Sequence, residues 1–253
     1  MYNIEGPITG TRDRFMRENM KIAVIAGTPV DTRMGVDYIE QKALSDGAAV
    51  EPVYLPVAED CDTQVRFQYS DADGKHAVID AIFDRALGAG IRDYFIYCNS
   101  LSGSFDFDTY AVRKSLDTGL DVRVYTPLQV YRELGRTYRR IGVMAANNLS
   151  AHGIEEALMS ANPEIYAIGA GNMSIVRAIE DGLTPSEICE KCRLADLLSY
   201  MEACGAEAVL LGCTHFPYLA DELAKFTDLP LIDPADSMFD AFIEKAFGTE
   251  TEN

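Results

Sequence analysis

The sequence has little positive charge and no long apolar run. Its 253 residues include 40 acidic but only 22 basic side chains, which gives a net charge of −18. Such a field repels nucleic acid and anionic membrane surfaces, so we expect no nucleic-acid and no membrane partner. No stretch approaches the roughly 20 apolar residues that cross a bilayer. A small acidic ligand would need local donors, such as backbone amides, hydroxyl groups or an arginine.

The beginning of the chain also lacks an apolar segment. Residues 1–20 are mixed polar and charged, and we expect them to form an N-terminal extension rather than a secretory signal. The cysteines are then expected to be reduced thiols of a cytoplasmic protein. There are six of them: Cys61, Cys98, Cys189, Cys192, Cys204 and Cys213.

Short apolar runs predict strands that alternate with helical patterns, in an order that occurs twice. The predicted strands of the first half are Lys21–Ala26, Val50–Leu55, Tyr94–Tyr97 and Val122–Tyr125. Those of the second half are Arg140–Ala145, Glu164–Ile168, Ala208–Leu211 and Leu229–Pro234. The repeat indicates an internal duplication of a doubly wound α/β unit with a parallel sheet.

The duplication predicts two similar domains, related by pseudo-twofold symmetry, with the active site in the cleft between them. We place the first domain at residues 1–126 and the second at 127–235. The last helix, at residues 236–248, is expected to pack back on the first domain. The stretch from Cys61 to Lys75 is expected to be a long loop, a solvated turn rather than a calcium site.

Two cysteines occupy equivalent places in the two halves. Cys98 and Cys213 each follow a predicted strand and precede small polar residues. Ligands of open α/β sheets bind at the carboxyl ends of the strands, and a helix N-terminus there would favour thiolate. A lone strand-end cysteine is often only a small buried hydrophobe. The paired placement favours chemistry instead, and His215 is predicted to orient the Cys213 thiol or donate a proton.

Two further features have ordinary interpretations. Cys189 and Cys192 have the spacing of a redox or zinc motif, but they follow no strand and lack a second ligand pair. Two cysteines one helical turn apart is therefore the favoured interpretation. Glu180 ends a helical stretch, and composition alone indicates a solvated helix end.

Two motifs resemble a known family. Cys98-Asn99-Ser100 and Leu211-Gly212-Cys213-Thr214-His215-Phe216-Pro217 resemble the two cysteine motifs of cofactor-independent glutamate racemases, and more broadly of the aspartate/glutamate racemase superfamily. The resemblance implies two similar α/β domains with the active site between them. It also implies racemisation at Cα of an acidic amino acid, glutamate or aspartate, without cofactor or metal.

The resemblance also implies roles for individual residues. Cys98 and Cys213 would be bases on opposite faces of the substrate, His215 would assist Cys213, and Glu180 would join the catalytic group. The predicted substrate-binding residues are Gly27, Thr28, Asn99, Ser100, Thr214 and Arg66.

The sequence departs from the family pattern in two places. The acid of the family's Asp-Ser-Gly turn is missing from Ala26-Gly27-Thr28-Pro29, and Asp31 is the acid that lies nearest along the chain. The family's Pro-Tyr-Gly loop is missing too, and Arg66 is expected to supply its contacts. Both departures bear on specificity more than on chemistry.

Several alternatives remain open from the sequence. Within the superfamily they are a hydantoin racemase, a maleate-type isomerase and a one-cysteine decarboxylase. Outside it they are a non-catalytic small-molecule binding protein and a thiol redox protein that uses Cys189 and Cys192. A homodimer is the assembly to be tested.

Overall fold

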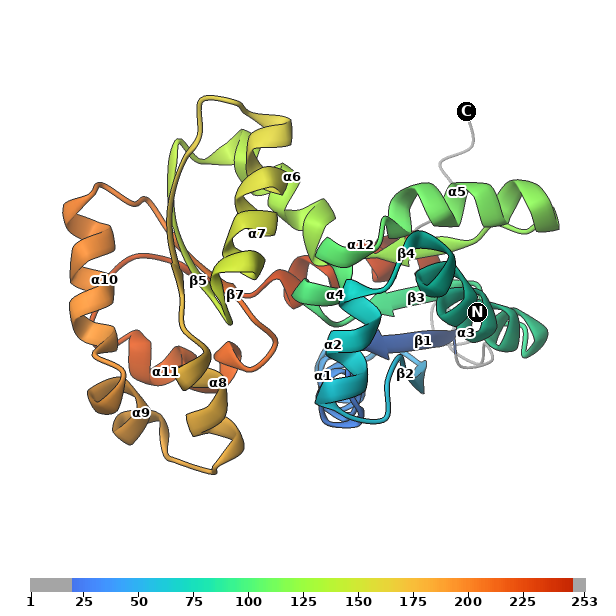
Figure 1. Ribbon diagram of the computed structural model, residues 1–253, viewed down its shortest axis with the longest axis horizontal. Coiled ribbons are helices and arrows are strands. Elements are labelled where there is room, and N and C mark those ends of the chain that lie inside the picture. The colour runs from blue at the N-terminus through green and yellow to red at the C-terminus, as the bar shows by residue number, and fades with distance from the viewer. Residues whose placement is uncertain (1–19, 248–253) are drawn as a thin grey trace, which may run out of the picture.

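The computed structural model describes residues 20–247, which form two α/β halves side by side (Figure 1). Each half contains a four-stranded sheet in which all pairs of strands are parallel. The strand order is β2-β1-β3-β4 in the first sheet and β6-β5-β7-β8 in the second. The two sheets therefore share one topology, which confirms the prediction of two similar α/β units. The predicted extension lies outside the described residues, except for Met20.

The first half alternates strands and helices, as parallel pairing requires. Its strands are β1 (Met20–Ala26), β2 (Val50–Pro56), β3 (Asp93–Ile96) and β4 (Arg123–Tyr125). Its helices are α1 (Pro29–Asp46), α2 (Cys61–Tyr69), α3 (Ala72–Gly88), α4 (Asn99–Ser104) and α5 (Phe107–Thr118).

The second half repeats the pattern. Its strands are β5 (Arg140–Ala145), β6 (Tyr166–Gly171), β7 (Val209–Gly212) and β8 (Leu231–Ile232). The helices that follow β4 in the chain are α6 (Pro127–Thr137), α7 (Asn148–Ala161), α8 (Met173–Glu180), α9 (Pro185–Lys191), α10 (Leu194–Ala203), α11 (Ala220–Leu223) and α12 (Pro234–Phe247). A 3₁₀ turn lies at Phe216–Leu219.

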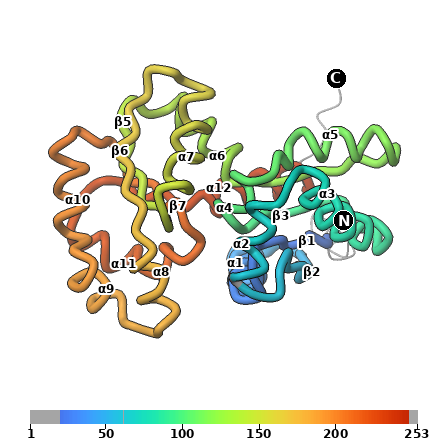
Figure 2. The backbone as a smooth tube through the Cα atoms, viewed as in Figure 1, coloured from blue at the N-terminus to red at the C-terminus, as the bar shows by residue number. Residues whose placement is uncertain are grey.

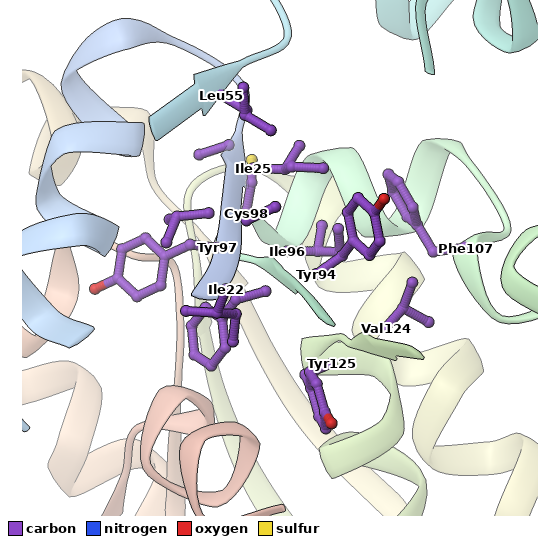
Figure 3. Packing of buried hydrophobic residues seen from close by; sticks show 14 of the residues in the cluster. Ile22, Ile25, Leu55, Tyr94, Ile96, Tyr97, Cys98, Phe107, Val124 and Tyr125 are labelled. Atoms are coloured by element: carbon purple, nitrogen blue, oxygen red, sulfur yellow. The ribbon is translucent and has the colours of Figure 1, made fainter. Parts of the chain in front are cut away.

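The central strands of the first sheet are apolar because both of their faces are covered. β1 is buried from Ile22 onward, and all of β3 is buried. Figure 3 shows Ile25, Ile96 and Cys98 in one cluster of packed side chains. The Cys98 thiol therefore lies at the end of a buried strand, in partly apolar surroundings.

The last helix, α12, packs against the first sheet although it follows the second in the chain. Phe242 and Met238 belong to the same buried cluster as β1 and β3. The ring of Phe242 lies 5.7 Å from that of Tyr125 in β4, between centroids. Figure 2 shows α6 and α12 between the two halves. The domain limits 1–126 and 127–235 stay a prediction.

The expected loop from Cys61 to Lys75 contains α2 and the beginning of α3. Asp60 and Asp71 are the N-caps of these helices, and each carboxylate accepts a hydrogen bond from the backbone N–H three residues on. Aspartate is common both in turns and at N-caps. The loop prediction was wrong because it took Asp71, a helix N-cap, for a turn residue.

Candidate active site

Cys98 lies where β3 gives way to α4, and α4 lies between the two halves (Figure 1). The Sγ atom of Cys98 is 3.4 Å from Ser100 Oγ and 3.7 Å from Gln64 Nε2. Gln68 Nε2 donates a hydrogen bond of 3.1 Å to the same hydroxyl. One amide and one hydroxyl thus contact the first thiol, and a second amide holds the hydroxyl.

Cys213 follows β7, which has the same place in the second sheet as β3 has in the first. A Cβ at Gly212 would overlap the side chain of Ile154 and lie 2.8 Å from the Met144 carbonyl oxygen, so the chain needs glycine there. His215 Nδ1 is 3.6 Å from Cys213 Sγ. The imidazole is therefore placed to exchange a proton with the second thiol.

The other ring nitrogen of His215 faces two carboxylates. Nε2 lies 3.7 Å from Asp31 Oδ1 and 3.6 Å from Glu180 Oε1. Asp31 belongs to α1 in the first half, and Glu180 is the last residue of α8 in the second. Asp31 is buried, which raises its pKa, and nearby His215 opposes that rise. Asp31 is thus the acid that follows the first turn, and its carboxylate lies beside His215.

The two thiols lie in one region of the structure. Asn99, the neighbour of Cys98, lines one small cavity together with Cys213. Tyr131 of α6 is fully buried, and its hydroxyl donates a hydrogen bond to Asn99 Oδ1, next to Cys98. The thiols and this hydroxyl therefore lie close together between the halves.

The expected lowering of the thiol pKa values is wrong. Burial raises the pKa of Cys98, and it raises that of Cys213 to about 12. The negative charge of Asp31 raises both further. The elements that follow the thiols, α4 and a 3₁₀ turn, have only 6 and 4 residues. Their dipoles are small beside the cost of moving a thiolate out of water.

The turn after β1 contributes two of the predicted substrate-binding residues. Thr28 is the N-cap of α1, and its Oγ1 donates a hydrogen bond of 3.1 Å to Asp31 Oδ2. A Cβ on Gly27 would overlap the side-chain amide of Gln64, which contacts Cys98. Gly27 therefore leaves room for a side chain that lies against the first thiol.

The remaining predicted residues divide into two groups. Asn99 and Thr214 line a small cavity together with Cys213, and Ser100 contacts the Cys98 thiol as described. Arg66 is exposed, and its guanidinium donates a hydrogen bond to Thr63 Oγ1 of the same helix. The structure thus gives Arg66 a contact within α2, and its role in substrate binding stays a prediction.

Gln64 and Gln68 of α2 stand where Arg66 was expected. They are four residues apart and so lie on one face of the helix, toward Ser100. The four-residue spacing was the one sequence feature that could have indicated these two residues. It places them on one face only if the segment is a helix, and no helix was predicted there. A cavity of about 270 Å³ beside Ser100 is also lined by Gln68 and Lys75.

The pair Cys189 and Cys192 lies on another element. Cys189 is buried within α9 in the core of the second half, and Cys192 is the C-cap that follows the last residue of that helix. Burial raises the pKa of Cys189 to about 11, which keeps the thiol protonated at neutral pH.

Comparisons with known proteins agree with this arrangement. Residues 126–241 match the family described as Asp/Glu/Hydantoin racemase. A glutamate racemase of Acidothermus cellulolyticus is 28% identical over 62% of this chain and 58% of its own length. The crystal structure of glutamate racemase from Francisella tularensis subsp. tularensis SCHU S4 covers 93% of this chain and 85% of its own, at 18% identity, with a TM-score of 0.66. Aspartate racemase from Picrophilus torridus covers 89% of this chain and 94% of its own, at 15% identity, with a TM-score of 0.62.

These matches identify the class of protein to which the chain is similar. The likeness in fold extends over both α/β halves of the chain. The resemblance to the aspartate/glutamate racemase superfamily, first seen in the two cysteine motifs, is confirmed. Among its members, the chain is similar to glutamate racemases in sequence and to glutamate and aspartate racemases in fold. The sequence match spans less than two thirds of the Acidothermus relative.

Proposed function

We propose that this chain is a cofactor-independent racemase that interconverts the enantiomers of an acidic amino acid. The observation that carries the proposal is the pair of thiols, Cys98 and Cys213, at equivalent strand ends of the two sheets. Each thiol has polar partners of its own, and Cys213 shares a small cavity with Asn99, the neighbour of Cys98. The names of the relatives, glutamate racemase and aspartate racemase, support an acidic substrate.

The two thiols suit a two-base reaction. One thiolate removes the proton from Cα, and the thiol on the opposite face donates a proton to the carbanion; in the reverse direction the roles exchange. The negative charge of the carbanion spreads onto the α-carboxylate. Fixed donors around the thiols then stabilise the transition state. Asn99, Ser100 and Thr214 are the side chains we assign to this task, with the Gly27–Thr28 turn beside them.

The surroundings of the first thiol also suit a second carboxylate. The site contains the acids Asp31 and Glu180, so an acidic substrate needs a cation or amides within the pocket. Lys75 and Gln68 line the cavity of about 270 Å³ beside Ser100. They provide a positive charge and an amide beside Ser100, while Glu156 lines the same cavity from the second half.

We also propose a homodimer and a cytoplasmic location. Size-exclusion chromatography tests the homodimer, and cell fractionation tests the location. Over residues 20–247, none of the helices has the length and apolar character needed to traverse a membrane.

The deciding experiment is a racemisation screen over the amino acids, read by chiral chromatography, with solvent deuterium uptake at Cα measured in parallel. We expect turnover of glutamate or aspartate without added pyridoxal phosphate and after exhaustive chelation. Binding of an amino acid without deuterium uptake would instead indicate a non-catalytic binding protein. Loss of activity on chelation that zinc restores would contradict the two-thiol chemistry.

A further inference from the structure

We propose that Asp31, in the first half, is a positioning residue for Cys213, the thiol of the second half, and that it acts through His215. This inference rests on the proposed racemase function. The imidazole lies between the other two groups. Its Nδ1 is 3.6 Å from Cys213 Sγ, and its Nε2 is 3.7 Å from Asp31 Oδ1.

The Asp31 carboxylate is held for this contact. The hydroxyl of Thr28, the N-cap of the same helix, donates to Oδ2 and leaves Oδ1 toward His215. The side chains of Asp31 and His215 are only 11% and 8% exposed, so water competes little for the contact. Glu180, the second carboxylate near Nε2, has a side chain that is 45% exposed. Asp31 is therefore the better shielded partner.

The Nε2 atom of His215 points to the same conclusion. It is buried, and among residues 20–247 it has no hydrogen-bond partner within normal distance. A buried N–H without an acceptor is costly, and catalytic hydrogen bonds are often long before substrate binds. A small closing movement of the two halves would turn the 3.7 Å contact with Asp31 into a hydrogen bond.

The contact has a definite chemical effect. With the proton of neutral His215 on Nε2, toward Asp31, its Nδ1 is free to accept the proton of Cys213. The products are a thiolate and an imidazolium, and Asp31 stabilises the imidazolium. The thiolate then takes the Cα proton, and the Cys98 thiol protonates the opposite face. The imidazolium proton returns through solvent to the Cys98 thiolate, which restores the starting state.

The net effect of Asp31 on thiolate formation is therefore opposite at the two thiols. Its charge acts directly on both and raises the pKa of each. Through His215 it acts on Cys213 alone and favours the thiolate. The imidazole separates the carboxylate from Cys213, so the interaction with the nearer imidazolium is the stronger one. Removal of the charge should make Cys98 more reactive and Cys213 less reactive.

The test is limited alkylation by iodoacetamide, which reacts with thiolates, with each cysteine followed separately by peptide mass spectrometry. Asp31→Asn is nearly isosteric, and Asp37→Asn, at an exposed position of the same helix, is its matched control. Relative to the control, we expect alkylation of Cys213 to slow by about tenfold or more, as for one pKa unit. Alkylation of Cys98 should stay the same or accelerate.

Faster alkylation of both thiols would overturn the proposal, because that is the result of direct charge alone. No change at Cys213 would overturn it as well. Asp31→Ser serves as a second variant should melting show that Asp31→Asn is unfolded. In a His215→Asn background, Asp31→Asn should no longer slow Cys213. Labelling needs no turnover, so it tests Asp31 separately, whereas racemisation by the unaltered protein tests the proposed function.

Discussion

Replacement of His215 by asparagine should impair the reaction most at neutral pH. Burial raises the pKa of Cys213 to about 12. At pH 8, four units below this pKa, a thiol that can lose its proton only to water would be a thiolate in about one molecule in 10⁴. The imidazole 3.6 Å away offers a shorter route, because it can take the proton directly. A positioned base of this kind typically contributes about 10²–10⁴ in rate, so we expect a loss of that size in kcat.

The pH dependence gives the sharper result. Because the Cys213 pKa is raised, its thiolate forms only as the pH rises toward that value. In His215→Asn the rate should therefore climb about tenfold per pH unit between about pH 7 and 10, more steeply than in the unaltered protein. Racemisation is followed from each enantiomer by chiral chromatography. His76→Asn, at an imidazole on α3 that does not line the cavity beside Ser100, is the control. A loss below tenfold, or parallel pH profiles, would refute the role given to His215.

Three further predictions follow from the same structure. Cys98→Ser and Cys213→Ser should each lose racemisation by several powers of ten. Each should keep Cα–H exchange with one enantiomer, the L-enantiomer for Cys98→Ser and the D-enantiomer for Cys213→Ser, as measured by proton NMR in deuterium oxide. Near-normal racemisation by either variant would contradict the two-base mechanism. Cys189→Ser combined with Cys192→Ser should leave turnover nearly intact, and a measured loss equal to that of His215→Asn would show that the chemistry lies elsewhere. Phe242→Ala should lower the free energy of unfolding by about 3–5 kcal/mol in urea titrations, because the ring is fully buried; a change under about 1 kcal/mol would mean that α12 adds little to the first core.

The features predicted from sequence were those with a strong local signal. Each buried strand is a short apolar run between polar segments, and the repeat of four such runs placed Cys98 and Cys213 at equivalent ends. The same local signal explains the failure at α2. That helix buries chiefly Phe67, so it has no apolar stripe, and its acidic N-cap resembles a turn residue.

Other features depend on tertiary structure and have no local signal. The contact of Asp31 with His215 joins positions far apart in the chain and depends on how the two halves meet. The thiol pKa values likewise depend on burial, which no motif encodes. The motif correctly placed Cys213 at a strand end, but the expectation that its pKa would fall ignored the cost of desolvation.

The position of α12 has a consequence for the order in which the protein folds. Met238 and Phe242 complete the core of a sheet whose last strand, β4, ends at Tyr125. During synthesis the first sheet leaves the ribosome long before these residues, so part of its apolar surface stays uncovered while the second half is made. N-terminal segments usually fold first, and exposed apolar surface invites aggregation or chaperone binding. We therefore expect the second half to finish folding before the first, so that maturation runs against the direction of translation.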